Sequence, residues 1–150
     1  MTGVTPQLFG LDDVIQLHGQ KISAENGHIL VFESGSLDSG LVPFRIARVF
    51  MVCSESSIER GKHMHKQCSQ VMFCIQGKAT VRYSDGRDWR VLEMDPNTAG
   101  AFVPPTIWAE QIYEKDSKLL VFCDRHYEAG DYIRDFDQFK AFRNIELESP

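Results

Sequence analysis

The sequence lacks an excess of positive charge, a long apolar run and an obvious export signal. Its net charge is −5, so no general attraction to nucleic acid or to an anionic membrane is expected. No stretch approaches the roughly 20 apolar residues that a membrane span needs. The first ten residues have neither the basic region nor the apolar core of a signal peptide. We therefore expect a cytoplasmic protein that binds neither nucleic acid nor membrane.

The four cysteines do not form a Cys-x-x-Cys motif. Cys53, Cys74 and Cys123 lie inside apolar, strand-like runs, where cysteine usually behaves as a small hydrophobic residue. Disulfides are therefore not expected, and this cysteine usage fits a reducing compartment.

Long helical periodicity is also missing, except near the C-terminus. Short β-type runs separated by turn residues fill most of the chain, and Asp85-Gly86 has the signature of a tight hairpin turn. The expected strands are 28–32, 44–53, 63–65 continuing toward 71–75, 79–83, 89–92, 100–103, 110–113 and 119–123. Such a series predicts an all-β fold, an antiparallel sandwich or barrel.

The C-terminal segment differs because Tyr132, Phe136, Phe139 and Phe142 recur near helical spacing. We interpret these aromatic residues as a packing stripe. Gly130 in the same run leaves open whether the tail forms one long helix or two short ones.

A chain of 150 residues is long enough for one domain with its own core. We predict a single domain over residues 1–150, with a barrel at about 28–125 and a short C-terminal helical tail at about 126–150.

The most informative feature is a pair of histidines, His63 and His65, separated by one residue. Alternate side chains of a β-strand point to the same face, so the two imidazoles would lie together. Such a pair indicates either a metal site or proton-transfer chemistry. The apolar run 71–75 that follows suits a barrel whose interior holds a ligand.

The spacing from Gly61 through the histidine pair to Gln70 and Gly77 is similar to the first conserved motif of the cupin barrels. Metal-binding cupins have a glutamate where Gln70 stands and a third histidine where Ala109 stands. A neutral amide is a poor ligand for a divalent cation, and alanine is none. We therefore expect no metal and interpret the pair as an acid/base site with Gln70 as a hydrogen-bonding neighbour.

More of the chain resembles one group of cupins, the metal-independent sugar-nucleotide ketoisomerases that interconvert dTDP-4-keto-6-deoxyglucose and its 3-keto isomer. The resemblance covers about residues 14–139. It rests on the segments 43–50, 60–66, 71–77, 104–108 and 131–139, of which the last is the most specific.

This resemblance implies a cupin jelly-roll barrel that binds a dTDP-linked keto-deoxysugar, a homodimer, and His65 as the base. A 3,4-ketoisomerisation removes a proton next to the C4 ketone, passes through an enediol and returns a proton to C4. One imidazole could make both transfers, while His63 stabilises the developing oxyanion. No metal, nicotinamide or flavin is needed, so we expect no cofactor.

Further substrate-binding residues are expected on the strands. Guanidinium groups offer forked donors that suit a pyrophosphate, which favours Arg60 beside the histidines and, after it, Arg48 and Arg82. Trp108, which follows the Pro-Pro pair, could pack on a sugar or base face.

Two positions depart from the family pattern. Met51, which we also expect among the substrate-binding residues, stands where the family commonly has a tyrosine. Ala109 stands near where a histidine or arginine usually follows the Pro-Pro-x-x-Trp segment. Tyr83 or Tyr113 could replace the missing hydroxyl. Two other interpretations stay open: a non-catalytic sugar-nucleotide-binding cupin that has lost the chemistry, and a metal-dependent cupin enzyme.

Overall fold

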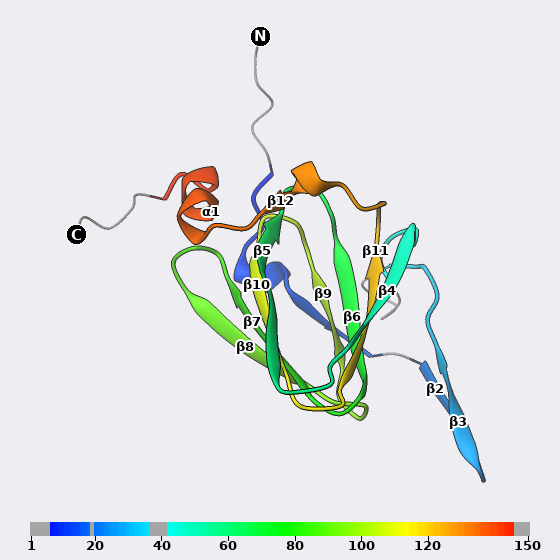
Figure 1. The fold of residues 1–150 in the computed structure, drawn as a ribbon. Helices are drawn as coiled ribbons and strands as arrows, with labels where there is room; N and C mark the ends of the chain where they lie inside the picture. Colours follow the sequence, from blue (N-terminus) through cyan, green and yellow to red (C-terminus); the bar gives the residue numbers. More distant parts are fainter. Residues whose placement is uncertain (1–6, 19, 37–41, 146–150) are drawn as a thin grey trace.

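Two five-stranded antiparallel sheets face each other in the computed structural model, which describes residues 7–18, 20–36 and 42–145 (Figure 1). One sheet has the order β1 (Ile15–Leu17), β9 (Gly100–Val103), β6 (Gln70–Gln76), β11 (Lys118–Cys123) and β4 (Arg48–Cys53). The other has the order β12 (Tyr132–Ile133), β5 (Ile58–His65), β10 (Trp108–Tyr113), β7 (Ala79–Ser84) and β8 (Trp89–Met94). This arrangement confirms the predicted antiparallel jelly-roll fold.

The main core lies between the two sheets. It is built from side chains that alternate along the strands, such as Val81 of β7, Met72 of β6 and Leu119 of β11, all nearly inaccessible to solvent. Most strand boundaries follow the sequence signals, because each apolar run ends at a turn residue. The expected starts at residues 44 and 63 are wrong, since β4 begins at Arg48 and β5 at Ile58. Gly77, for example, has a φ of 72° between β6 and β7, a conformation that side chains other than glycine rarely adopt.

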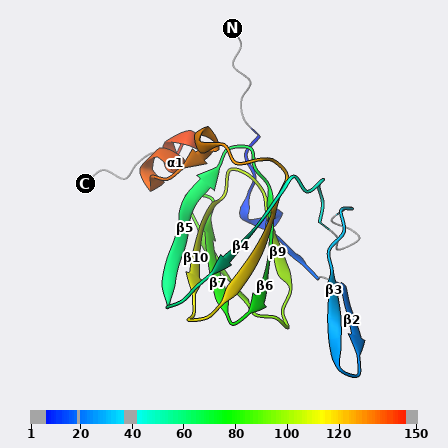
Figure 2. The same ribbon diagram turned by 45° about the vertical axis from the view of Figure 1, so that its right-hand side comes forward.

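A separate two-stranded hairpin, β2 (Gln20–Ala24) and β3 (Gly27–Val31), projects away from the barrel in both views (Figures 1 and 2). The expected barrel start near residue 28 is therefore wrong, because this run pairs within the hairpin. The barrel instead takes in β1, whose three residues are too few to show an alternating pattern. A short 3₁₀ turn, η1 (Leu11–Asp13), precedes β1.

The C-terminal tail begins with a 3₁₀ turn, η3 (Ala129–Asp131), and ends with the helix α1 (Phe136–Phe142). The Asp135 side chain caps α1 by accepting a hydrogen bond from the backbone N–H of Gln138. The predicted helix is thus confirmed at its end but is wrong for Tyr132, which belongs to β12 and pairs with His65. The last five residues of the expected tail lie outside the described residues.

α1 packs onto the second sheet through aromatic contacts. The Phe139 ring is fully buried, with its centroid 5.6 Å from that of Trp108 and 5.5 Å from that of Phe136. This cluster also includes Met64 of β5, so the tail is fixed to the strand that carries both histidines. Among the described residues, no helix is long and apolar enough to cross a membrane.

Phe139→Ala should lower the free energy of unfolding by about 3–5 kcal/mol, because it leaves a cavity beneath α1 that the aromatic neighbours cannot fill. Urea denaturation measures this loss. Val91→Ala, on the exposed outer face of β8, is the matched control and should cost less than about 1 kcal/mol. Similar losses for both variants would show that α1 contributes little to stability.

Candidate active site

A cavity of about 410 Å³ opens between the two sheets. Its volume lies in the range of small-molecule sites. Most of its wall comes from β4, β5, β6, β10 and β11, and the tail contributes side chains from both sides of η3. The lining residues are Arg48, Phe50, Val52, Arg60, Gly61, His63, Gln70, Met72, Gln111, Tyr113, Leu119, Val121, Tyr127, Tyr132 and Arg134.

A β-bulge in β5 lets both Arg60 and His63 face this cavity. Residues three apart on a regular strand point to opposite sides, but the pairing with β10 slips by one residue, from Ala109↔His63 to Glu110↔Gly61. Gly61 (φ 83°) and Lys62 (φ 54°) take left-handed backbone conformations there. A Cβ on Gly61 would lie 2.5 Å from the Gln111 side-chain oxygen, so any other residue there would also displace this side chain from its place in the cavity wall. From the sequence, Arg60-Gly61 would form a turn before the histidines. The structure instead has a β-bulge at this point, inside the continuous strand β5.

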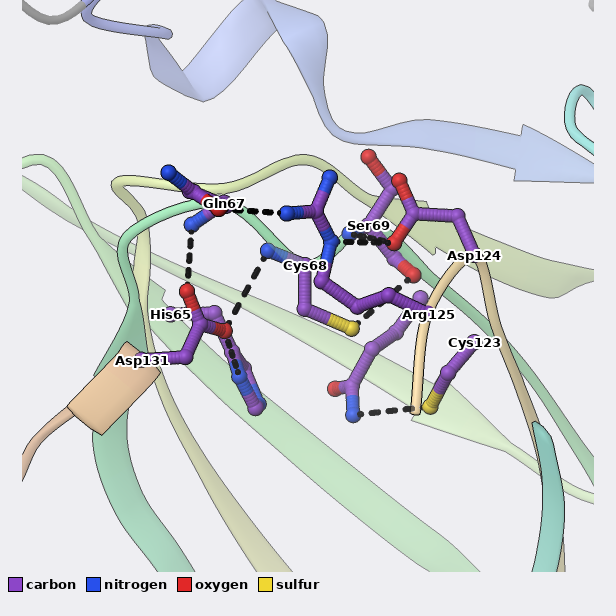
Figure 3. A network of polar contacts seen from close by, with 9 residues as sticks. His65, Gln67, Cys68, Ser69, Cys123, Asp124, Arg125 and Asp131 are labelled. Atoms are coloured by element: carbon purple, nitrogen blue, oxygen red, sulfur yellow. Dashed lines mark hydrogen bonds and ion pairs between the residues drawn. The ribbon is translucent and has the colours of Figure 1, made fainter. Parts of the chain in front are cut away.

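His65, at the end of β5, forms a buried hydrogen bond with Asp131 of the tail (Figure 3). The His65 Nδ1 lies 3.0 Å from the Asp131 Oδ2. The same carboxylate accepts hydrogen bonds from the backbone N–H groups of Gln67, at 2.7 Å, and Cys68, at 3.3 Å. Because a carboxylate accepts, the neutral imidazole carries its proton on Nδ1 and keeps a lone pair on Nε2.

Three rings form a compact group at this end of the cavity. The Tyr132 ring centroid lies 4.4 Å from that of His65 and 5.0 Å from that of His63, and the two imidazoles are 4.9 Å apart. The His65 Nε2 and the His63 Nδ1 are buried and have no hydrogen-bond partner among the described residues. Buried polar atoms normally have a partner, so these two nitrogens are available to a bound molecule.

Both imidazoles are neutral at neutral pH. Burial, first of all, and the neighbouring His65 lower the pKa of His63 from 6.5 to about 4. Burial also lowers the pKa of His65, against the opposing effect of its hydrogen bond to Asp131. A neutral imidazole can accept a proton, so both groups are in the state that a general base needs.

Positive charge surrounds the site although the chain as a whole is acidic. Arg48 and Arg60 line the cavity from β4 and β5, and Arg134 lines it from the segment after β12. Three guanidinium groups in one cavity match an anionic ligand with several acceptor oxygens, such as a diphosphate.

One group of side chains could also hold a metal ion. Ligand atoms of His65, Cys68 and Asp131 all lie within 4.8 Å of one another and are buried. In the structure the Asp131 carboxylate already accepts hydrogen bonds from His65 and from the Cys68 backbone N–H. The Cys68 Sγ instead lies 3.5 Å from the Ser69 carbonyl oxygen.

The structure brings together His63, Arg48, Arg60 and Gln70 in the cavity wall, with His65 directly behind. It does not bring the other three expected substrate-binding residues there. Met51 points outward from β4 because Phe50 and Val52, on either side, face the cavity.

Trp108 and Arg82 are also placed outside the cavity. Trp108 packs against Phe139 of α1. The Arg82 Nη1 lies 3.7 Å from the Glu110 Oε2, and its guanidinium lies over the Trp89 ring at 4.9 Å. Both positions belong to the outer, tail-covered side of the second sheet.

Sequence reasoning gave no site role to Asp131, Tyr132, Tyr127 or Arg134. All follow β11, in a region that helical spacing assigned to a packing tail. The available signal was that 131–139 is the most specific segment of the family resemblance, which a mere packing tail would not explain.

Comparisons with known proteins show which family the chain resembles. The model of the family "FdtA: WxcM-like, C-terminal" matches residues 12–144. A TDP-4-oxo-6-deoxy-alpha-D-glucose-3,4-oxoisomerase from Aneurinibacillus thermoaerophilus is 30% identical over 125 residues, which cover 82% of this chain and 87% of that protein.

Solved structures are similar as well. QdtA, a sugar 3,4-ketoisomerase from Thermoanaerobacterium thermosaccharolyticum in complex with TDP, superposes with a TM-score of 0.80 at 28% identity, covering 89% of this chain and 96% of that one. A variant of that enzyme with a histidine replaced by asparagine, in complex with TDP-4-keto-6-deoxyglucose, superposes with a TM-score of 0.79 at 27% identity and covers 92% and 99% of the two chains.

The lowered pKa of His63 predicts a pH-dependent stability. Between pH 6.5 and about 4 the unfolded chain binds a proton at this position and the folded chain does not, so stability falls as the pH falls through this window. The full effect is about 3 kcal/mol. Urea denaturation of wild type and His63→Gln from pH 7 to pH 4 should show a steeper decline for wild type. Parallel curves would show that His63 is not desolvated in the folded protein.

Proposed function

The chain belongs to the FdtA family, and we propose that it is a TDP-sugar 3,4-ketoisomerase of deoxysugar biosynthesis, acting on a TDP-linked 4-keto-6-deoxyhexose. The observation that carries the proposal is the His65–Asp131 pair at one end of an arginine-lined cavity. The similarity to a 3,4-oxoisomerase and to ketoisomerase structures with bound TDP and TDP-4-keto-6-deoxyglucose supports it.

In this proposal the diphosphate binds to the guanidinium groups of the cavity and the keto sugar lies against the histidines. Arg60 is separated from His63 by the bulge on the same strand, so one ligand can reach both. Gln70 and Gln111 line the cavity between the sheets and supply amide groups for sugar hydroxyls.

His65 is the proposed base. Its Nε2 takes the proton from C3, next to the C4 ketone, and returns a proton to C4 on the same face of the sugar. Asp131 holds the ring orientation through Nδ1 and stabilises the imidazolium that forms between the two transfers. His63, whose unpartnered Nδ1 is buried beside it, stabilises the oxyanion.

The chemistry requires no redox partner, because the electron pair that leaves the C3–H bond ends in the same molecule. The alternative of a non-catalytic binding protein relied on Met51 and Ala109. Met51 points away from the cavity, so its replacement of a tyrosine removes no group from the wall. Ala109 is buried in the core on β10, so that alternative now rests on this position alone.

His65→Asn should lower kcat by about 10²-fold or more, the usual effect of removing a general acid/base. Asp131→Asn should also lower kcat, because the amide no longer stabilises the imidazolium. TDP affinity should stay nearly constant in both. Conversion of TDP-4-keto-6-deoxyglucose, followed by NMR, and TDP binding by calorimetry measure the two effects.

His126→Asn is the matched control, since His126 is exposed and outside the cavity lining. It should retain wild-type turnover. A larger loss of kcat for His63→Asn than for His65→Asn would reassign the base to His63, and no loss for either would refute the proton-transfer site.

A homodimer in the cytoplasm completes the proposal. The four free cysteines fit a reducing compartment. The β2–β3 hairpin exposes a cross-strand pair of isoleucines, Ile22 and Ile29, which are 49% and 61% exposed. A two-stranded hairpin is marginally stable alone, so its apolar face favours docking onto a second copy of the chain.

Ile22→Glu/Ile29→Glu should convert the dimer to a monomer, because two carboxylates would be buried in the interface. Sedimentation at micromolar concentration measures the mass. Ser23→Glu/His28→Glu, the neighbouring cross-strand pair on the opposite face of the hairpin, is the control and should remain dimeric. A monomeric wild type would contradict the homodimer.

A further inference from the structure

A 3,4-ketoisomerisation moves a proton between two oxygens as well as between two carbons. When the C3–H proton leaves, its electron pair forms the C3=C4 bond and the C4 carbonyl oxygen becomes an oxyanion that needs a proton. When C4 is reprotonated, the C3 hydroxyl loses its proton as the C3 carbonyl forms. The base accounts for the proton transfer between the two carbons, so the proton transfer between the two oxygens needs a second group.

Tyrosine hydroxyls are the natural candidates, and among the described residues Tyr113, Tyr127 and Tyr132 line the cavity. Tyr113 lies at the far end. It pairs with Ile58, five residues before His63 on β5, which is roughly 15 Å along the strand. Burial also raises the pKa of Tyr113, so its proton is held more tightly.

Tyr132 is the phenol at the histidines. Its ring contacts both imidazoles, at centroid distances of 4.4 and 5.0 Å. It precedes Arg134 and follows Asp131, so its backbone is fixed by β12 pairing with His65 and by the carboxylate network. Tyr127 contacts Tyr132 at 5.5 Å but is 57% exposed, which places it at the rim.

Two cations lie near Tyr132. The Arg134 guanidinium lies over its ring, 4.4 Å from the centroid. Arg48 lines the same cavity, and although burial lowers the pKa of Arg48, interaction with Tyr132 helps to raise it. The phenol ring is therefore held between the two imidazoles and the Arg134 guanidinium, next to the cavity that would hold the sugar.

We infer that Tyr132 is a second catalytic residue, whose hydroxyl protonates the C4 oxygen of the enediolate and then accepts the proton of the C3 hydroxyl. The inference rests on the proposed ketoisomerase function. One proton leaves the phenol and one returns, so the residue ends the cycle unchanged. Arg134, whose guanidinium lies over the ring, acts through Tyr132 as a positioning residue.

The test compares Tyr132→Phe with wild type in D₂O, using TDP-4-keto-6-deoxyglucose and NMR. The variant keeps the ring and its packing. Its kcat should fall by about 10²-fold, while KM and the TDP dissociation constant stay within about threefold of wild type. Without the oxygen transfer the enediolate returns to substrate, so deuterium should enter C3 of unreacted substrate faster, relative to product formation, than in wild type.

Tyr83→Phe is the matched control, because it removes a hydroxyl from a buried core tyrosine outside the cavity lining. It should retain wild-type turnover and exchange ratio. Three results would overturn the role of Tyr132: turnover of Tyr132→Phe close to wild type, losses of exchange and product in equal proportion, or the same loss in Tyr83→Phe. Wild type that binds TDP but neither exchanges nor converts the substrate would instead refute the proposed function itself.

Discussion

The hydrogen bond between the Asp131 carboxylate and the His65 imidazole connects the barrel to the C-terminal tail, and the candidate site uses residues from both. His65 is at the end of β5, and Asp131 is in η3, more than sixty residues later in the chain. The carboxylate is itself held by the backbone N–H groups of Gln67 and Cys68, directly after β5. This contact holds the tail next to β5, where Tyr132 pairs with His65. The Tyr132 ring therefore lies against both histidines.

The cavity wall depends equally on a local irregularity in β5. A strand with strict alternation could present the arginine or the histidines to the interior, but not both, since Arg60 and His63 differ by an odd number of residues. The extra residue at Gly61-Lys62 reverses the alternation of side chains between the two faces of β5 once. The left-handed backbone of these two residues lets β5 continue its pairing with β10. One glycine therefore places an anion-binding group and a proton-accepting group in the same cavity.

The sequence predicted the strands well and the tail poorly, for different physical reasons. Barrel strands such as β6 and β11 are apolar runs between turn residues, so local sequence is enough to find them. β12 has two residues, and nothing in Tyr132-Ile133 distinguishes a strand that pairs with His65 from a turn of helix. Its conformation is decided by tertiary pairing, which a spacing of aromatic residues does not reveal.

The candidate site residues differ in the same way. The spacing of His63 and His65 has a meaning on any strand, and the structure places His63 and the neighbouring Arg60 in the cavity wall. Met51, Arg82 and Trp108 lie outside that wall, because neither a family resemblance nor a position on a strand tells which face a side chain takes. The burial pattern of β4, which alternates from Arg48, shows that Met51 faces outward.

Charge and burial act together at the histidines. Arg134 lowers the pKa of both imidazoles, and Arg48 lowers that of His65, in addition to the larger effect of burial. In the unliganded protein a proton on either ring is therefore unfavourable. A bound diphosphate offsets the same guanidinium charges, so the imidazolium that forms during the reaction is less disfavoured when substrate is present. In the proposed function, the arginines that bind the substrate thus also make proton acceptance depend on its binding.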